Sequence, residues 1–240
     1  MTGVEVVAGY SAYIRLVGSL ISGKDTLRTG MTQEVDRVAA AIDMACKGKA
    51  VALVSSGDPG IYAMAGLALE MCEARKLTAI PAQKQSLEPT ASKDSLMIEV
   101  VPGIPALCAG AALLGAPLTH DFAAISLSDL LTPWEIIEKR LYAAAIADFV
   151  IVIYNPKSKK RDWQLERARE ICLMYRDFQT PVGIVTSAMR EGQEVSITTL
   201  ERLNTAAVNM QTTVFIGNRS TRHYGDFLYT PRGYGNKYGF

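Results

Sequence analysis

The 240-residue sequence has no excess of charge of either sign and no long apolar run. Lys and Arg together number 25 and Asp and Glu 24, so the chain has no overall field that would attract nucleic acid or a membrane surface. No stretch approaches the roughly 18 apolar residues of a membrane span, and the first residues lack the charged and apolar regions of a signal peptide. We therefore expect a cytoplasmic protein that binds neither nucleic acid nor membrane.

Cysteine pairs and dinucleotide-binding loops are also missing. The cysteines occur singly, without the spacing of metal ligands, and this pattern predicts reduced, buried thiols and no metal site. A nucleotide-binding dehydrogenase would need Gly-x-Gly-x-x-Gly after its first strand, and no such loop is present. Apolar residues make up 49% of the chain, enough for the cores of one large or two modest domains.

Short apolar runs alternate with segments of helical periodicity along the whole chain, which predicts an α/β protein with parallel or mixed sheets flanked by helices. The polar, Pro-containing stretch 116–121 favours a boundary between domains 1–118 and 119–240. Residues 79–94 read as an exposed loop. The expected strands are 4–8, 50–54, 95–101, 122–127, 149–154, 181–186, 195–198, 213–216 and 226–229, and the expected helices are 11–21, 35–45, 61–72, 107–114, 133–147, 163–175 and 200–203.

The strongest local signal lies in residues 50–66. A continuous apolar run, typical of a strand buried on both faces, ends in Ser-Ser-Gly-Asp-Pro-Gly at 55–60, and helical periodicity follows. In an open parallel sheet, ligands bind at such carboxyl ends of strands. Asp58 offers an acceptor for an amine or hydroxyl, and free amides at a helix start suit a carboxylate. The alternative is a turn with no role in binding.

Three further strand ends open into small or polar residues: 101–105, 126–130 and 154–157. We expect them to converge with 55–60 on one cleft. Residues 56–62, 101–106, 126–134 and 154–158 resemble the corresponding stretches of the tetrapyrrole methyltransferases of cobalamin synthesis, and the last two resemble the branch that methylates C17. The resemblance covers nearly the whole chain. It implies a two-domain fold with S-adenosylmethionine in the cleft between the domains, a homodimer, and methyl transfer to C17 of precorrin-3B or cobalt-precorrin-3 with ring contraction.

The resemblance also implies roles for individual residues. Tyr62 has an alternative as a packing aromatic. Ring contraction needs proton transfers, for which Asp129, Ser128, His120 and Asp121 are candidates, Asp129 and Ser128 the preferred ones, with helix capping as the alternative for Asp129. His120 is a candidate for the substrate, but it and Asp121 could equally form a boundary turn. Lys157 and Arg161, in a basic run after a strand, are candidates for the substrate's carboxylates or members of a solvated surface; a second basic group is Arg219, Arg222 and His223. The residues implied for the cofactor are Gly57, Asp58, Ile61, Tyr62, Pro105, Ala106, Asn155 and Ala188.

One segment departs from the family pattern. Members normally begin with an apolar strand and a Gly-x-Gly-Pro-Gly loop before a segment like 4–10, and here only Met-Thr-Gly comes first. We therefore expect unpaired backbone groups in the first sheet. A truncated, inactive protein that binds S-adenosylmethionine or a tetrapyrrole is the alternative to an enzyme. The sequence leaves open whether the macrocycle carries cobalt.

Overall fold

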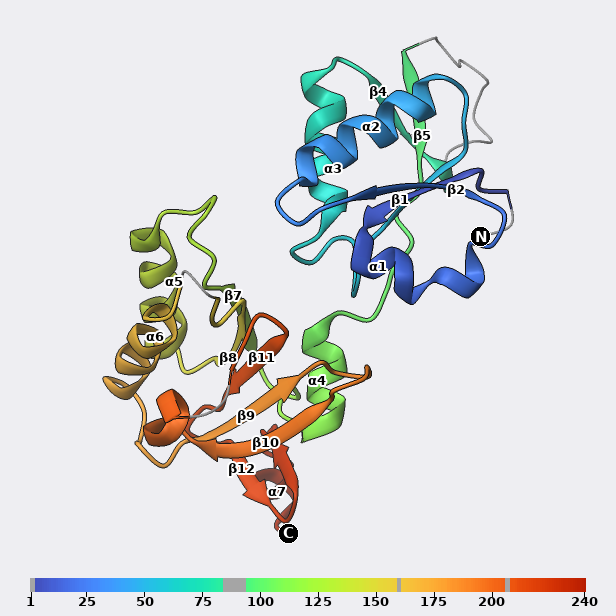
Figure 1. Cartoon of the computed structure of the whole chain (residues 1–240). Helices are drawn as coiled ribbons and strands as arrows, with labels where there is room; N and C mark the ends of the chain where they lie inside the picture. The colour runs from blue at the N-terminus through green and yellow to red at the C-terminus, as the bar shows by residue number, and fades with distance from the viewer. Residues whose placement is uncertain (1–2, 84–93, 159–160, 206–207) are drawn as a thin grey trace. The chain divides into compact units, whose positions relative to one another are not determined.

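The structure, a computed structural model, describes residues 3–83, 94–158, 161–205 and 208–240. It divides into two compact units, Met1–Pro105 and Ala106–Phe240. This division lies before helix α4 (Ala106–Leu114), whereas the sequence placed a boundary at 116–121. Both units combine strands with flanking helices, so the predicted α/β class is confirmed (Figure 1).

The first unit contains two small parallel sheets. In one, β1 (Val6–Tyr10) lies between β2 (Asp25–Thr29) and β3 (Val51–Val54); in the other, β4 (Thr78–Pro81) pairs with β5 (Ser95–Ile98). Among the described strands, β3 pairs only with β1 and β5 only with β4. All four residues of β3 are consequently half-buried, so the prediction of a strand fully buried on both faces is wrong. The expected loop 79–94 is wrong at 79–81, which belong to β4, and its region 84–93 lies outside the described residues.

Helices cover both faces of the β1 sheet. α1 (Ser11–Leu16), followed by the 3₁₀ turn η1 (Gly18–Leu20), lies on one side, and α2 (Glu34–Cys46) and α3 (Met64–Ala74) lie on the other (Figure 1). The alternation of side chains along β1 sends Val7 toward α1. The α2–α3 side packs against residues of both sheets. Its core consists of Val38, Ile42 and Cys72, with Leu53 from β3 and Leu96 and Ile98 from β5 against it.

The second unit is built on a five-stranded mixed sheet in the order β10-β9-β11-β8-β7. β7 and β8 are parallel, and both β8 and β9 run antiparallel to β11. Thus β7, β8 and β9 point the same way, and their carboxyl ends share one edge, which we call the site edge. The strands are β7 (Phe122–Ser126), β8 (Val150–Tyr154), β9 (Pro181–Thr186), β10 (Glu194–Thr199) and β11 (Thr212–Ile216).

Helices α5 (Trp134–Ile146) and α6 (Gln164–Leu173) cover one face of this sheet, and α4 packs against its β9 and β11 strands. α4 is rich in Ala and Gly, and the structure shows why this matters. A Cβ at Gly110 would lie 2.8 Å from ring atoms of Phe215, so a glycine is needed for α4 to approach β11 this closely.

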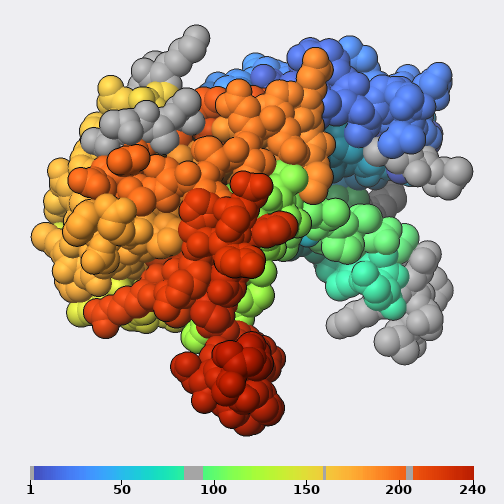
Figure 2. All heavy atoms as spheres, turned by 90° about the horizontal axis from the view of Figure 1, so that it is seen from below, coloured from blue at the N-terminus to red at the C-terminus, as the bar shows by residue number. Residues whose placement is uncertain are grey.

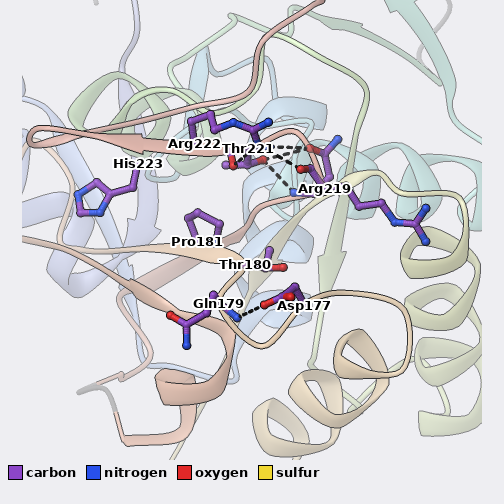
Figure 3. Close-up of a pocket in the computed structure, with 9 residues that line it drawn as sticks. Asp177, Gln179, Thr180, Pro181, Arg219, Thr221, Arg222 and His223 are labelled. Carbon is purple, nitrogen blue, oxygen red and sulfur yellow. Dashed lines mark hydrogen bonds between the residues drawn. The ribbon is translucent and has the colours of Figure 1, made fainter.

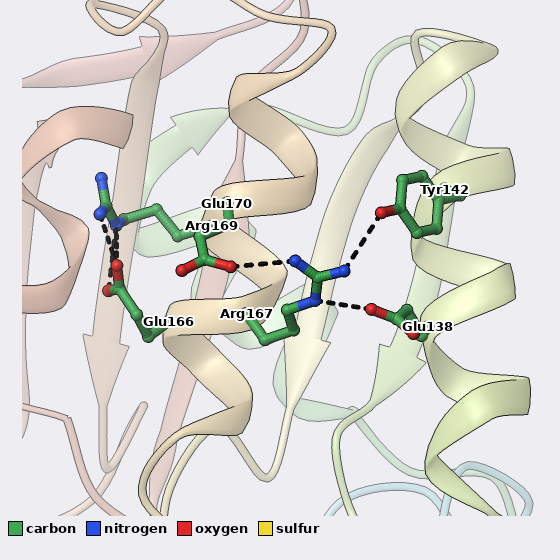
Figure 4. A network of polar contacts seen from close by, with 6 residues as sticks. All are labelled: Glu138, Tyr142, Glu166, Arg167, Arg169 and Glu170. Carbon is green, nitrogen blue, oxygen red and sulfur yellow. Dashed lines mark hydrogen bonds and ion pairs between the residues drawn. The ribbon is translucent and has the colours of Figure 1, made fainter.

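An ion-pair network joins α5 to α6 (Figure 4). Arg167 donates from Nε to Glu138 at 2.6 Å, from Nη1 to Glu170 at 3.0 Å and from Nη2 to the Tyr142 hydroxyl at 3.2 Å. These contacts raise the pKa of the Arg167 guanidinium, Glu170 contributing most. The network links α5 to α6 on the side of the two helices that faces away from the apolar core.

The small sheet and the last helices were predicted only in part. β6 (Gly115–Ala116), β12 (Arg222–Tyr224) and β13 (Phe227–Tyr229) form a small sheet, and η3 (Leu200–Thr205) and α7 (Tyr234–Tyr238) are short helices. The sequence predicted β13 as the strand 226–229 and η3 as the helix 200–203, but not β6, β12 or α7. In Figure 2 the last residues, in dark red, protrude from the rest of this unit, and Phe240 is 90% exposed. Within the described part of the chain, no helix is long and apolar enough to cross a membrane.

Candidate active site

In the first unit, the carboxylate of Asp58 ties two loops together. Its Oδ1 accepts the amide of Gly60 at 2.8 Å and its Oδ2 the amide of Gly103 at 3.0 Å. These bonds, the one from Gly103 first, hold the pKa of Asp58 below its usual value. The ends of β3 and β5 therefore converge. Each oxygen retains a second lone pair, so the carboxylate can still accept a bond from a ligand.

Glycines let these loops approach. Gly57 has a φ of +78°, a conformation that favours glycine, and an added Cβ there would meet Cα of Pro105 at 3.7 Å. A Cβ on Gly103 would lie only 2.1 Å from the carbonyl oxygen of Gly57. The predicted residues Gly57, Asp58 and Pro105 are thus brought together within one unit.

Ile61 and Tyr62 lie in the turn before α3, not within it, because α3 begins at Met64 rather than at 61 as predicted. Tyr62 has a φ of 52° and is 55% exposed. A left-handed conformation at a bulky aromatic is strained, and such strain gathers at functional sites. The role of Tyr62 at the cofactor stays a prediction.

At the site edge of the second unit, a chain of hydrogen bonds links the loops after β7 and β8. Asn155 has a φ of 51°, and its Nδ2 donates to Oγ of Ser126 at 3.0 Å. The same oxygen accepts the amide of Ser128 at 3.2 Å. Asparagine tolerates the left-handed region better than most residues, which suits it to this position. The predicted residues Ser128 and Asn155 therefore lie together.

Asp129 is held by a residue that the sequence analysis missed. Its Oδ2 accepts a bond from Nε2 of Gln164 at 2.9 Å, and Gln164 is 2% exposed. A signal for Gln164 does exist in the sequence, because it lies on the buried face of α6 four residues before the apolar Ala168. A polar side chain on such a face needs a partner.

Ala106 and Ala188 also lie beside this edge. Ala106 begins α4, and the next amide, of Leu107, donates to the Tyr154 hydroxyl at 2.9 Å, which fixes the start of α4 to the end of β8. Ala188 follows β9 between Ser187 and Met189, which have φ values of 50° and 57°. The edge thus carries strained backbone after both β8 and β9.

The basic residues predicted to bind the substrate differ in exposure and in position along the sheet. Lys157 is exposed just after β8, as a surface contact for an anion requires. Arg161 is only 6% exposed and donates from Nη2 to the carbonyl of Asn155 at 3.0 Å, so it faces the protein. His120 precedes β7 and accepts the amide of Asp121, at the opposite end of the strand from Ser126. The structure therefore does not bring His120 together with the other predicted residues. Lys159 and Lys160 lie outside the described residues.

The second basic group lines a cavity of about 340 Å³ in the same unit. The cavity lies between the start of β9 and the turn after β11, at the edge of the sheet opposite the site edge. In Figure 3 the side chains of Arg219 and His223 point to opposite sides, so the group offers no single anion-binding centre. In the part of the chain that the structure describes, no group of His, Cys, Asp and Glu could hold a metal ion.

Comparisons with known proteins show which family the chain resembles. Residues 2–204 match the family of Tetrapyrrole (Corrin/Porphyrin) Methylases. The chain is 46% identical over 235 residues to the cobalt-factor III methyltransferase of Priestia megaterium, covering 98% of this chain and 41% of that protein's length. It is 44% identical over 234 residues to the probable cobalt-factor III C(17)-methyltransferase of Salmonella typhimurium, covering 98% of this chain and 90% of the other.

A solved structure has a similar fold. The crystal structure of the methyltransferase CobJ superposes with a TM-score of 0.80 at 36% identity, over 95% of this chain and 89% of that one. One conclusion follows from the family model that matches most of the sequence, from the named relatives and from the similar fold. The chain belongs to the tetrapyrrole (corrin/porphyrin) methylase family.

Proposed function

We propose that this protein transfers a methyl group from S-adenosylmethionine to C17 of a cobalt-bearing factor III or precorrin-3 macrocycle, with ring contraction, in cobalamin synthesis. The observation that carries the proposal is the identity of 44–46%, over 98% of the chain, to methyltransferases named for cobalt-factor III. This similarity supports the enzyme over the inactive binding protein. Metal-free precorrin-3B is the alternative substrate.

The residues present fit S-adenosylmethionine as the methyl donor. In the first unit, Gly57 and Gly103 are exposed, so the backbone of both loops is accessible to a ligand. Asp58 offers free lone pairs there. In the second unit, Ala106 begins α4, Ala188 follows β9, and Asn155 follows β8 with a side-chain amide that can donate and accept. We assign to the cofactor these residues and Ile61, Tyr62 and Pro105.

The bound S-adenosylmethionine supplies an already activated methyl group, so the protein's main task is to align the acceptor carbon with it. No nucleophilic residue is required. Ring contraction needs a positioned acid or base. We assign this part to Asp129, held by Gln164, and to Ser128, whose amide is fixed by Ser126. Each reaches the site edge from the loop after β7.

The substrate's carboxylates need cations. Lys157, exposed at the site edge, is the residue we assign to them. We also infer that the protein works in the cytoplasm as a homodimer, since the family resemblance implies a dimer; light scattering of the purified chain tests the dimer.

The test combines binding with turnover. The purified chain is titrated with S-adenosylmethionine by calorimetry and then incubated with methyl-labelled cofactor and either cobalt-factor III or precorrin-3B. We expect label in a product heavier by one methyl group, from the cobalt-bearing substrate. Label only from precorrin-3B would transfer the assignment to the metal-free substrate. Binding of the cofactor without label in either product would favour the inactive binding protein.

A further inference from the structure

Two polar side chains are buried beneath the site edge, and neither belongs to the apolar core. Arg161, in the loop before α6, is 6% exposed, and Gln164, the first residue of α6, is 2% exposed. Removing a guanidinium or an amide from water is unfavourable unless its hydrogen bonds are replaced. Here the replacement is incomplete, because Nε of Arg161 and Oε1 of Gln164 have no hydrogen-bond partner among the described residues. Their burial therefore calls for a reason other than stability.

Arg161 acts on Asn155. Its Nη2 donates to the Asn155 carbonyl at 3.0 Å and lies 3.8 Å from the sulfur of Met210. The Asn155 backbone is in the left-handed region, which asparagine tolerates better than most residues but does not adopt by default. A charge-assisted bond to the carbonyl enforces it. With the backbone held, the side-chain amide is aimed at Ser126.

Gln164 acts on Asp129 in the same way. An ionised carboxylate only accepts hydrogen bonds, so the group that Gln164 turns toward Asp129 must be its NH₂. The 2.9 Å contact from Nε2 to Oδ2 meets this requirement, and Oε1 is left without a partner as a consequence. Gln164 thus orients the Asp129 carboxylate with its NH₂ group, while its own amide oxygen stays without a hydrogen bond among the described residues.

We propose that Arg161 and Gln164 are positioning residues: from one short segment they hold Asn155 and Asp129, the groups on the loops after β8 and β7, in the arrangement that methyl transfer and ring contraction need. The inference rests on the proposed function of these two loops. It assigns Arg161 to the protein's own backbone instead of the substrate's carboxylates. Fixing both loops before binding lowers the cost of aligning the reactants.

The first test uses the ligand-free chain and does not depend on activity. Heteronuclear NMR follows the side-chain NH₂ of Asn155 and the backbone amide of Ser128 in wild type, Arg161→Met, Arg161→Lys and Gln164→Leu. Arg161→Lys keeps the charge but cannot reproduce the planar donor, and it serves if Arg161→Met folds poorly. Arg169→Met is the matched control, since Arg169 pairs with Glu166 on the same helix. We expect hydrogen exchange to accelerate at least about tenfold at the Asn155 NH₂ in both Arg161 variants and at the Ser128 amide in Gln164→Leu, and to be unchanged at both positions in the control. Unchanged exchange at the Asn155 NH₂ would overturn the role of Arg161, and unchanged exchange at the Ser128 amide would overturn that of Gln164, whatever the enzyme does.

The second test separates binding from chemistry. Arg161→Met is expected to raise the Kd for S-adenosylmethionine at least about tenfold, and to add no further loss on an Asn155→Ala background. Gln164→Leu is expected to lower kcat at least about tenfold and to leave that Kd within about twofold of wild type. Additive losses at Arg161 and Asn155, or wild-type kcat in Gln164→Leu, would overturn the inference. If the wild type itself transfers no methyl group, the proposed function fails, and the exchange rates alone decide the inference.

Discussion

The contact between the Gly57 and Gly103 loops predicts a large effect of one added methyl group. In Gly103→Ala the Cβ would lie 2.1 Å from the Gly57 carbonyl oxygen, 3.1 Å from its carbon and 3.4 Å from Cα of Asp58. All three are backbone atoms, so no side chain can rotate out of the way. Carbon contacts relax to about 3.5 Å, so the loops must separate by more than about 1 Å.

The expected cost is that of overpacking, about 1 to 3 kcal/mol in the free energy of unfolding. The same displacement pulls the Gly103 amide away from the Asp58 carboxylate, which it now meets at 3.0 Å. We therefore also expect weaker binding of S-adenosylmethionine. Gly66→Ala is the matched control: Gly66 lies in the first turn of α3, is exposed, and has no atom within 4 Å of an added Cβ. In a helix this change stabilises by up to about 1 kcal/mol.

Urea denaturation of the three proteins measures the difference. Far-UV circular dichroism follows both units, whereas fluorescence follows only the second, because both tryptophans, Trp134 and Trp163, lie there. Gly103→Ala should lower the midpoint of the dichroism transition and Gly66→Ala should leave or raise it. A midpoint for Gly103→Ala equal to that of wild type would refute the reasoning, and so would an equal fall in both variants.

Three more outcomes follow. Because the native pKa of Asp58 is lowered, its contribution to stability is complete above the unfolded pKa of about 3.9 and is lost as the pH falls through the native value. Asp58→Asn should therefore be less stable than wild type at pH 7, with a gap in chemical denaturation that closes below about pH 4; a constant gap would contradict this. Arg167→Met should lose up to about 1 kcal/mol at low salt and less at high salt, and a loss independent of salt would exclude the ion pairs as its cause. A thiol reagent at neutral pH should label two of the four cysteines quickly, since burial raises the pKa of Cys72 and raises that of Cys172 to about 11; fast labelling of all four would contradict the burial. The accessible thiols are Cys46 and Cys108, for which the prediction of buried thiols is wrong, and the protected ones are Cys72 and Cys172.

The sequence predicted the elements whose signals are local. β9 occupies 181–186 as expected, because an apolar run lies between a proline-containing turn and a polar segment. β2 was missed because its sequence, Asp-Thr-Leu-Arg-Thr, lacks apolar alternation. It forms through pairing with β1 along five residues, a contact between segments well apart in the chain. Such pairing is decided by tertiary structure and leaves little trace in the strand itself.

In the candidate site too, the sequence predicted the features that depend on local signals and missed those that depend on tertiary packing. The turn glycines and Asp58 could be found because Gly-Asp-Pro-Gly directly after an apolar run is typical of a strand that ends in a tight turn. The sequence could not show whether a polar side chain faces solvent or the protein interior. Arg161 belongs to a basic run that reads as surface, yet its guanidinium is buried against Asn155. His120 stands close in sequence to Asp129 but at the other end of the intervening strand. The direction in which a side chain points and its burial are decided by tertiary packing, so the local sequence does not predict them.

The separation of the first unit's strands into two sheets has a consequence for how the chain folds at high concentration. Among the described strands, β3 and β5 each present one edge without a strand partner, and β3 is wholly apolar. Free amides and carbonyls along an apolar edge are a template for strands of neighbouring molecules. Folding therefore competes kinetically with self-association at this edge, and the yield of monodisperse protein should fall as the refolding concentration rises.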